Sequence, residues 1–328
     1  MLPCEATPQL KAIMSRFGRD SKPKTRNLAQ PVRTPTGTVL KAIDADMQSM
    51  IGDFDVLPTM PTVLANIQSA LQSGRSDAQH VAKLVGSDVA LTAQILRVVN
   101  SAYYGLSRPI LDLRYAVAYL GFSEVYRIVL TVAVVQGLEV DDQEAVARFW
   151  HHSFYTAIVA KYVAGLYDRL VDPGELWPAA LLHDVGQLVY MKLYPKHFEA
   201  IESHRNTHSS TLAEAETSLA LPSHTALGAM LCRKWHLPET LADVCENHEL
   251  KVPERVEGTD TMIAFRRLVA ASSILTELAE GHLSPEAREQ QGRQVRKLLK
   301  ITSADFIRLM ASVYDMRSDA DAFTSAVT

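Results

Sequence analysis

Leu181-Leu182-His183-Asp184-Val185-Gly186 places a histidine beside an aspartate inside the apolar run 179–190. Burying an unpaired charge is costly, so a titratable pair in such a run predicts a partner for both side chains. Adjacent residues on a helix point about 100° apart, and both can therefore lean toward one point on its buried face. Imidazole nitrogen and carboxylate oxygen are ligands for divalent metals. The stretch is the starting point for a metal-type site.

Three further histidines, His152, His224 and His248, lie in apolar helical settings. His248 follows apolar residues three, four and seven places earlier, which puts it on the apolar face of its helix. His152 also has apolar neighbours at helical spacing, but His151 points about 100° away from it, and spacing does not choose between the two. Nor does spacing separate one shared site from a set of histidines with separate partners.

Composition narrows the class of protein. Of the 328 residues 47% are hydrophobic, with 15 glycines and 15 prolines, which is typical of an ordinary helix-rich protein with a sizeable core. The net charge of −4 argues against broad nucleic-acid binding. Through Leu40, seven basic and two acidic side chains give a local charge of +5, so the remainder carries −9.

Cysteine usage and hydropathy indicate a compartment. The three cysteines, Cys4, Cys232 and Cys245, show no paired spacing, which favours a reducing environment without a disulfide framework. No stretch approaches the roughly 20 apolar residues of a membrane span, and the N-terminus lacks the apolar segment of a signal peptide. We therefore expect a cytoplasmic protein that does not enter a membrane.

Hydrophobic periodicity predicts an all-α fold, because apolar residues recur at steps of three and four and no alternating strand pattern is present. Residues 1–38 contain five prolines and predict a flexible basic tail. Residues 39–140 predict an N-terminal helical subdomain. After the polar break Asp141-Asp142, residues 141–328 predict a second helical subdomain with C-terminal helices.

Two helices of the second subdomain matter below. One is predicted from Leu176 to Leu193 and would run through the His183-Asp184 pair. The last helix is predicted from Ser303 to Tyr314. Both predictions rest on apolar spacing alone.

Several short motifs, spread from about Met50 to His248, carry a family resemblance. They are Leu57-Pro58-x-x-Pro61, Asp88-x-x-Leu91-x-x-x-Ile95-Leu96-Arg97, Asn100-Ser101-Ala102-Tyr103-Tyr104-Gly105, Tyr119-Leu120-Gly121, Trp150-x-His152-Ser153, Leu181-Leu182-His183-Asp184-Val185-Gly186, His224-x-x-x-Gly228, Trp235-x-Leu237-Pro238 and Asn247-His248. With these motifs the chain resembles the HDOD family of bacterial signalling modules, within the HD-domain superfamily of metal-dependent phosphohydrolases.

The resemblance implies an N-terminal helical bundle packed on an HD-like helical bundle. In catalytic HD enzymes, histidines at such positions and the His-Asp pair hold one or two metals that activate water for phosphoester hydrolysis. Carried over, the candidate metal ligands are His152, His183, Asp184, His224 and His248, with Asp184 as the candidate catalytic residue. A divalent metal (Fe, Mn, Mg, Zn or Ni) is the candidate cofactor.

Departures from the catalytic pattern weigh against turnover. HD phosphohydrolases usually close the site with a later aspartate, whereas the corresponding stretch here, 268–273, offers only Ser272 and Ser273. Gln187 stands where cyclic-dinucleotide phosphodiesterases of the superfamily commonly have lysine, and their Gly-Tyr-Pro signature is absent. We therefore expect a non-enzymatic signalling or regulatory module with a metal- or nucleotide-type pocket.

The alternative is a metal-dependent phosphohydrolase acting on a nucleotide or cyclic dinucleotide, which the intact His and Asp set keeps open. The expected partners are signalling proteins and, as a candidate ligand, a small nucleotide. Nucleic-acid binding through the basic tail is not expected, because no recognition motif accompanies it.

Overall fold

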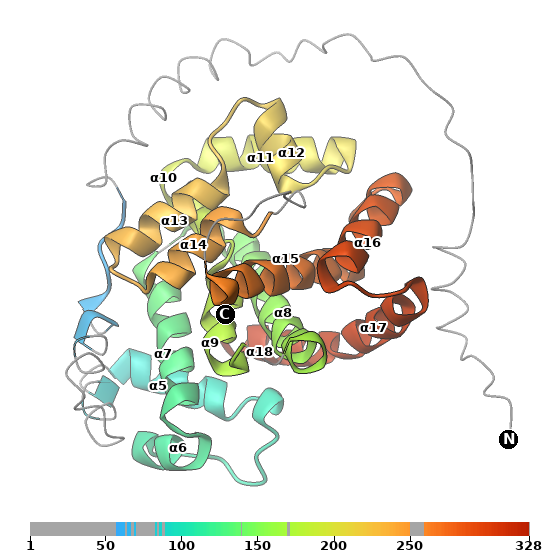
Figure 1. Ribbon diagram of the computed structural model, residues 1–328. Coiled ribbons are helices and arrows are strands. Elements are labelled where there is room, and N and C mark those ends of the chain that lie inside the picture. The colour runs from blue at the N-terminus through green and yellow to red at the C-terminus, as the bar shows by residue number, and fades with distance from the viewer. Residues whose placement is uncertain are drawn as a thin grey trace, which may run out of the picture.

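The computed structural model describes residues 57–62, 64–66, 69, 83, 85, 86, 89–138, 140–168, 171–249 and 259–327. Regular structure in these residues is helical, which confirms the predicted all-α fold (Figure 1). The elements are α5 (Val89–Val99), the 3₁₀ helix η2 (Ala102–Tyr104), α6 (Leu113–Leu120), α7 (Phe122–Gly137), α8 (Gln143–Tyr167), α9 (Pro173–Leu182), α10 (Gly186–Leu193), α11 (Pro195–His208), α12 (Leu212–Ser218), α13 (His224–Lys234), α14 (Glu239–Asn247), α15 (Asp260–Glu280), α16 (Pro285–Leu299), α17 (Ser303–Asp315) and α18 (Arg317–Val327).

The N-terminal helices are organised around α7, which packs against α5, α6 and α9. Its side chains Val125, Ile128, Val129 and Val132 are almost fully buried. Burying a side chain of this kind stabilises a fold by about 1.5–3 kcal/mol. α6 begins where the Asp112 carboxylate accepts the backbone N–H of Arg114, the usual cap for a free helix N-terminus.

α8 is the central helix of the second bundle and packs against α9, α15 and α18 (Figure 1). It begins at an Asp142 cap and buries side chains on most of its faces, among them Trp150, Phe154 and Val159. A helix that is apolar around most of its circumference belongs in a core. α8 therefore fixes the positions of the helices that surround the His183-Asp184 pair.

The Leu57-Pro58 segment is tied to the second bundle by two hydrogen bonds. Lys234 donates to the carbonyl of Leu57 at 2.7 Å, and the Trp235 indole donates to the carbonyl of Pro58 at 2.8 Å. Both donors lie at the end of α13, far from this segment in sequence. The motif thus contacts the helix that begins at His224.

The predicted single helix from Leu176 to Leu193 is wrong, because a turn at residues 183–185 separates α9 from α10. Within it the Val185 amide donates to the carbonyl of Leu182, and the Gln187 amide donates to the carbonyl of Asp184. Hydrogen bonds between residues three apart in the chain are of the 3₁₀ type and tighten a helix end. Apolar periodicity did not reveal the break, because the turn residues are as buried as the helices around them.

The chain also continues past the predicted last helix, since α18 follows α17. α18 buries Ala320, Phe323 and Ala326 against α8, α5 and η2. The centroid of the Phe323 ring lies 5.2 Å from the ring centroid of Tyr103 and 4.1 Å from the ring centroid of Phe154. The C-terminal helix therefore joins the N-terminal helices to the central one.

Two predictions about domain organisation are not tested by the structure. The predicted tail 1–38 lies outside the described residues, and the division at 140/141 stays a prediction.

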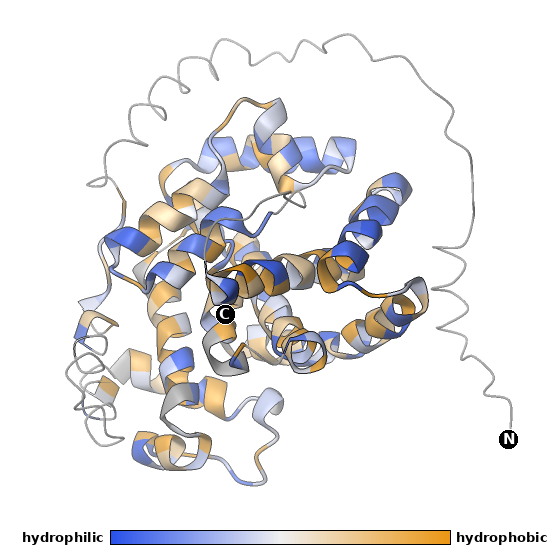
Figure 2. Cartoon of the chain, viewed as in Figure 1, coloured by the Kyte–Doolittle hydropathy of each residue, from blue (hydrophilic) through white to orange (hydrophobic). Residues whose placement is uncertain are grey.

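None of the described helices has the length and apolar character needed to cross a membrane. Figure 2 shows α16 as largely hydrophilic, in keeping with burial of only one of its faces.

Candidate metal centre

Asp184 lies in the turn between α9 and α10, directly against the start of α13. Gly186 makes this approach possible, because a Cβ at that position would overlap the backbone carbonyl of His224 and lie 2.8 Å from the amide nitrogen of Gly228. Only a residue without a side chain allows two backbones so close. The contact brings His224, the first residue of α13, to the Asp184 carboxylate.

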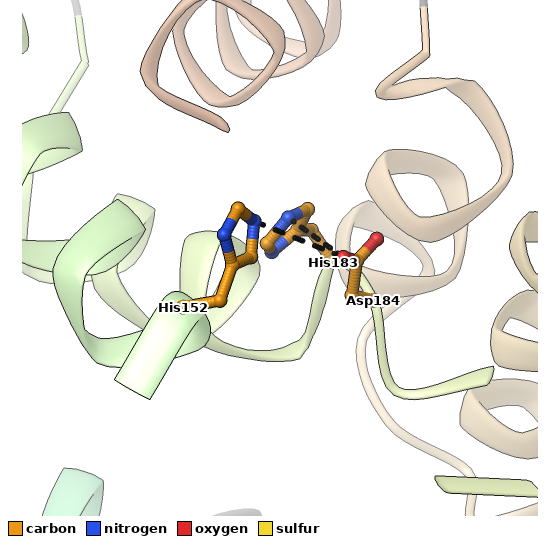
Figure 3. Close-up of side chains that lie close together, drawn as sticks. All are labelled: His152, His183 and Asp184. Atoms are coloured by element: carbon orange, nitrogen blue, oxygen red, sulfur yellow. Dashed lines mark ion pairs between the residues drawn. The ribbon is translucent and has the colours of Figure 1, made fainter. Parts of the chain in front are cut away.

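The five candidate ligands lie together. Asp184 Oδ1 is 3.1 Å from His224 Nε2 and 3.0 Å from His248 Nε2. Asp184 Oδ2 is 3.5 Å from His183 Nε2 and 3.9 Å from His152 Nε2. Figure 3 shows His152 and His183 turned toward Asp184 from α8 and from the turn. All four imidazoles therefore face one carboxylate through the same ring atom.

Two metal-type groups share this carboxylate within the described part of the chain. His152, His183 and Asp184 form one, and Asp184, His224 and His248 form the other; in each, the ligand atoms lie within 4.8 Å of one another. Apart from the partly buried His152, these side chains are buried. The arrangement offers nitrogen and oxygen ligands to one ion or to two.

Backbone carbonyls orient two of the histidines. His183 Nδ1 lies 2.7 Å from the carbonyl of Ala180, and His248 Nδ1 lies 3.0 Å from the carbonyl of Cys245. A carbonyl only accepts, so each Nδ1 carries the hydrogen. Each Nε2 is then the atom turned toward Asp184, which is the orientation that metal-bound histidines usually have.

Carboxylates orient the other two. His152 Nδ1 lies 3.1 Å from Glu280 Oε2, and His224 Nδ1 lies 2.9 Å from Glu216 Oε1. Burial lowers the pKa of His152, but the carboxylates of Glu280 and Asp184 outweigh it and raise this pKa to about 9. A metal at Nε2 would take the place of that proton.

His183 provides the test of whether the site fits a metal. Burial lowers the pKa of His183 to about 3, so the ring is neutral near pH 7. With Nδ1 donating to Ala180, the Nε2 lone pair is buried and has no hydrogen-bond partner. An unpaired buried acceptor is unfavourable. A divalent cation beside Asp184 would satisfy it, so the residues present fit such an ion.

Asp184 is held as an anion. Burial by itself would raise its pKa, but the adjacent His183 and hydrogen bonds from His224 and His248 lower the pKa well below the usual value. The Gln187 amide also donates to Oδ2 at 2.6 Å. The group therefore stays charged at neutral pH and remains available as an anionic ligand.

The structure distinguishes His152 from His151, which spacing had left open. His151 turns away from Asp184: its Nε2 lies 2.9 Å from Asp321 on α18, and its Nδ1 lies 3.3 Å from Glu280. His152 alone of the two faces the cluster.

Sequence reasoning missed the carboxylates around the cluster. Glu277 and Glu280 lie four and seven residues after Ser273 on α15, a spacing that shares one helix face and could have drawn attention to them. Ser272 does not face the site as a free ligand, because its hydroxyl donates to the carbonyl of Leu268 at 2.7 Å. Glu216 gave no signal in the sequence, as it contacts His224 across a turn.

A cavity of about 1040 Å³ opens onto the cluster. Its wall includes Asp184, Gln187 and three of the histidines, together with residues of α11, α12, α15 and α16. Arg205 of α11 is among these lining residues. Burial opposes the charge of Arg205, yet the carboxylates of Glu202 and Glu277, and more weakly Asp184, raise its pKa above the usual value. The guanidinium thus lies within electrostatic reach of the cluster.

The sequence model of the HDOD domain matches residues 57–250, more than half of the chain. The chain belongs to the HDOD family. This HDOD protein is 24% identical over 276 residues to an uncharacterized protein of Treponema pallidum (strain Nichols), with 83% of this chain and 52% of that protein covered. It therefore spans about half the length of this curated relative.

Solved structures share the fold. An HDOD domain protein of unknown function from Geobacter sulfurreducens is 25% identical with a TM-score of 0.64, over 89% of this HDOD chain and 98% of the other. A proposed phosphohydrolase from Shewanella amazonensis SB2B is 20% identical with a TM-score of 0.66, over 87% and 99%. A proposed signal transduction protein from Marinobacter aquaeolei VT8 is 18% identical with a TM-score of 0.66, over 97% and 65%. At these lower identities the last two show the fold alone.

Proposed function

We propose that this HDOD protein is a regulatory signalling module whose buried pocket holds a divalent metal for ligand recognition rather than for turnover. One observation carries the proposal: the four Nε2 atoms of His152, His183, His224 and His248 converge on Asp184. Each Nδ1 is held by an oxygen on its far side. Hydrogen bonding of this kind is the usual support of metal-bound histidine.

Asp184 and the four histidines would hold the metal. When bound, the ion would neutralise the buried carboxylate and polarise an oxygen of a ligand or water. Glu216 and Glu280 would keep His224 and His152 in place through Nδ1. The cluster would then recognise a ligand that reaches it through the cavity.

The surroundings support recognition over hydrolysis. Gln187 donates to Asp184 and adds no positive charge, while Glu277 and Glu280 place carboxylates on the same cavity. A phosphoryl-transfer transition state gains negative charge, so catalysis needs cations where it develops. Residues 268–273 of α15 contain no aspartate to close a two-metal site, and the Ser272 hydroxyl is bonded to its own helix.

A metal-dependent phosphohydrolase is the second candidate. The observation in its favour is the cavity of about 1040 Å³ that reaches Asp184, since small-molecule sites typically have volumes of about 300–1,000 Å³. A nucleotide phosphodiester could therefore enter.

Metal content tests the first part of the proposal. Protein purified without chelator or a nickel tag should contain about one or two divalent ions per chain, as the two groups sharing Asp184 allow. His248→Ala should lose most of this metal. His282→Ala is the matched control, because His282 lines the same cavity but lies outside the cluster. Metal-free wild-type protein, or equal loss in both variants, would contradict the proposal.

Turnover separates the two candidates. Metal-loaded protein is mixed with a panel of nucleotide phosphodiesters and cyclic dinucleotides, and we expect slow hydrolysis or none. Metal-dependent turnover near 1 s⁻¹ or faster, roughly the low end for enzymes, that disappears in Asp184→Ala would establish the phosphohydrolase instead.

A further inference from the structure

The Arg205 guanidinium is hydrogen-bonded through Nη1, whereas its Nε–Nη2 edge makes no hydrogen bond. Its Nη1 donates to Glu202 Oε1 at 2.8 Å, one turn earlier on α11. Its Nη2 forms a long ion pair with Glu277 Oε1 at 3.9 Å, which is beyond hydrogen-bond distance. Its Nε is buried and has no hydrogen-bond partner. The side chain is therefore held in place, but its Nε lacks a hydrogen-bond acceptor.

The open edge has a defined chemistry. In a planar guanidinium, Nε–H and Nη2–H point in parallel from the same side and fit two oxygens of a phosphoryl or carboxylate group. This is the edge of Arg205 that Glu202 leaves free. A buried donor without an acceptor is unfavourable, and an oxygen of a ligand or of water would satisfy it.

The edge also lies in the right cavity. Arg205 lines the same space as Asp184 and Gln187, and Asp184 is one of the charges that act on its pKa. A ligand that reaches the Asp184 cluster can therefore contact Arg205 as well. Gln187 provides no cation at the cluster itself, whereas Arg205 places a guanidinium on the wall of the same cavity.

We propose that Arg205 is the oxyanion-binding residue of the pocket, and that the ligand of the pocket carries a phosphoryl or carboxylate group. The oxyanion of the ligand would bind the Nε–Nη2 edge of Arg205, and another part of the ligand would contact the Asp184 cluster. This inference rests on the proposed function in that both place the ligand in the same cavity.

Glu277 is the internal competitor for that edge. The Gln291 amide donates to its Oε2 at 2.6 Å and keeps the carboxylate in place, so its Oε1 does not close onto Arg205. Burial raises the pKa of Glu277. The 3.9 Å separation between Arg205 Nη2 and Glu277 Oε1 thus leaves the edge available to a stronger acceptor.

The test is titration of the full chain with inorganic phosphate and, separately, with acetate, followed by calorimetry. At least one of the two should bind. Arg205→Gln should weaken that binding about tenfold or more, the loss expected for hydrogen bonds to a charged group. Arg205→Lys should weaken it less, about threefold, because lysine keeps the charge but lacks the paired donors. Binding of phosphate alone would identify a phosphoryl ligand, and of acetate alone a carboxylate ligand.

Arg148→Gln is the matched control. Arg148 lines the same cavity but pairs with Glu144 at an exposed position, so its loss removes the same charge without the open edge. The control should change binding by less than about twofold. Equal weakening by the Arg148 and Arg205 variants, unchanged binding in a folded Arg205→Gln, or no binding of either anion would overturn the proposal.

Metal analysis of the same samples separates this inference from the proposed function. If the wild-type chain holds no metal, the metal pocket fails, while the comparison of Arg205 variants is still read from anion binding. If metal is bound and Arg205→Gln leaves both metal and anion binding unchanged, only the inference about Arg205 fails. Circular dichroism confirms that each variant is folded.

Discussion

Glu280 Oε2 lies 3.1 Å from His152 Nδ1, at the point where the end of α15 meets α8. The same carboxylate contacts His151, which reaches Asp321 on α18. Burial would raise the pKa of Glu280, but the two histidines lower it. One carboxylate thus orients the cluster histidine and links the pocket to the C-terminal helix.

Loss of Glu280 should weaken metal binding. In Glu280→Ala, His152 loses the acceptor that fixes its ring, and removal of such a partner typically lowers metal affinity about 10–100-fold. Competition with a chromophoric chelator measures the change. Glu286→Ala, at an exposed glutamate of α16, is the control and should bind as the wild type does. Equal affinities in the two variants would show that Glu280 does not orient the site.

Gly186→Ala should be strongly destabilising. Its Cβ would overlap the His224 carbonyl, so α13 must move, and overpacking of this kind costs about 1–3 kcal/mol or more. Gly165→Ala is the matched control on α8, with nothing within 4 Å of a Cβ, and should be neutral or stabilise by about 0.5–1 kcal/mol. Urea unfolding compares the two, and a Gly186→Ala as stable as wild type would refute the close approach.

The Arg266–Asp243 pair should be a main support between α14 and α15. Arg266 donates through Nε at 2.6 Å and also through Nη2 to the buried Asp243 carboxylate. Asp243→Ala leaves a buried guanidinium without this anion, and such a loss costs about 3–5 kcal/mol. Glu289→Ala, which breaks the exposed pair with Arg293, should cost less than about 1 kcal/mol. Similar unfolding midpoints in urea for both would argue against a structural role.

Tyr103 should make the fold sensitive to alkali. Burial, with help from Glu124 and Asp319, raises the pKa of Tyr103 to about 12, whereas an unfolded tyrosine ionises near about 10. The folded state favours the protonated phenol, so its contribution to stability is fully present below about pH 10 and is lost as pH rises through about 12. The alkaline unfolding midpoint of Tyr103→Phe should therefore lie at higher pH.

Absorbance of tyrosinate against pH measures this effect, with circular dichroism to follow unfolding. Tyr115→Phe is the control, since Tyr115 is 60% exposed, and its midpoint should match the wild type. A Tyr103→Phe midpoint equal to the wild-type value would mean that ionisation of Tyr103 does not limit stability at high pH.

The fold class could be predicted from apolar spacing, whereas the five members of the cluster were predicted from the resemblance to the HDOD family. Helical spacing of apolar residues requires a buried face, so the all-α fold follows from periodicity. His183 and Asp184 stand in an apolar run, where a polar pair must find partners. The structure brings the predicted five residues together; their role as metal ligands stays a prediction.

Other features depended on contacts between distant segments. The turn at 183–185 is followed by Gly186, which lies against the backbone of α13, and no local pattern encodes that approach. Glu280, 128 residues beyond His152, contacts both His151 and His152. The two histidines differ in their other contact, which is Asp184 for His152 and Asp321 on α18 for His151.

Local sequence determined which segments are helical and which polar residues must be buried, because both depend on the spacing of apolar side chains. Tertiary structure decided which atoms those polar residues face. Glu280 and Arg205 are charged residues that a sequence pattern places equally well at the surface. Their positions beside His152 and on the shared cavity arise only when helices far apart in the chain pack together, because burial of a charge depends on the partners that packing supplies.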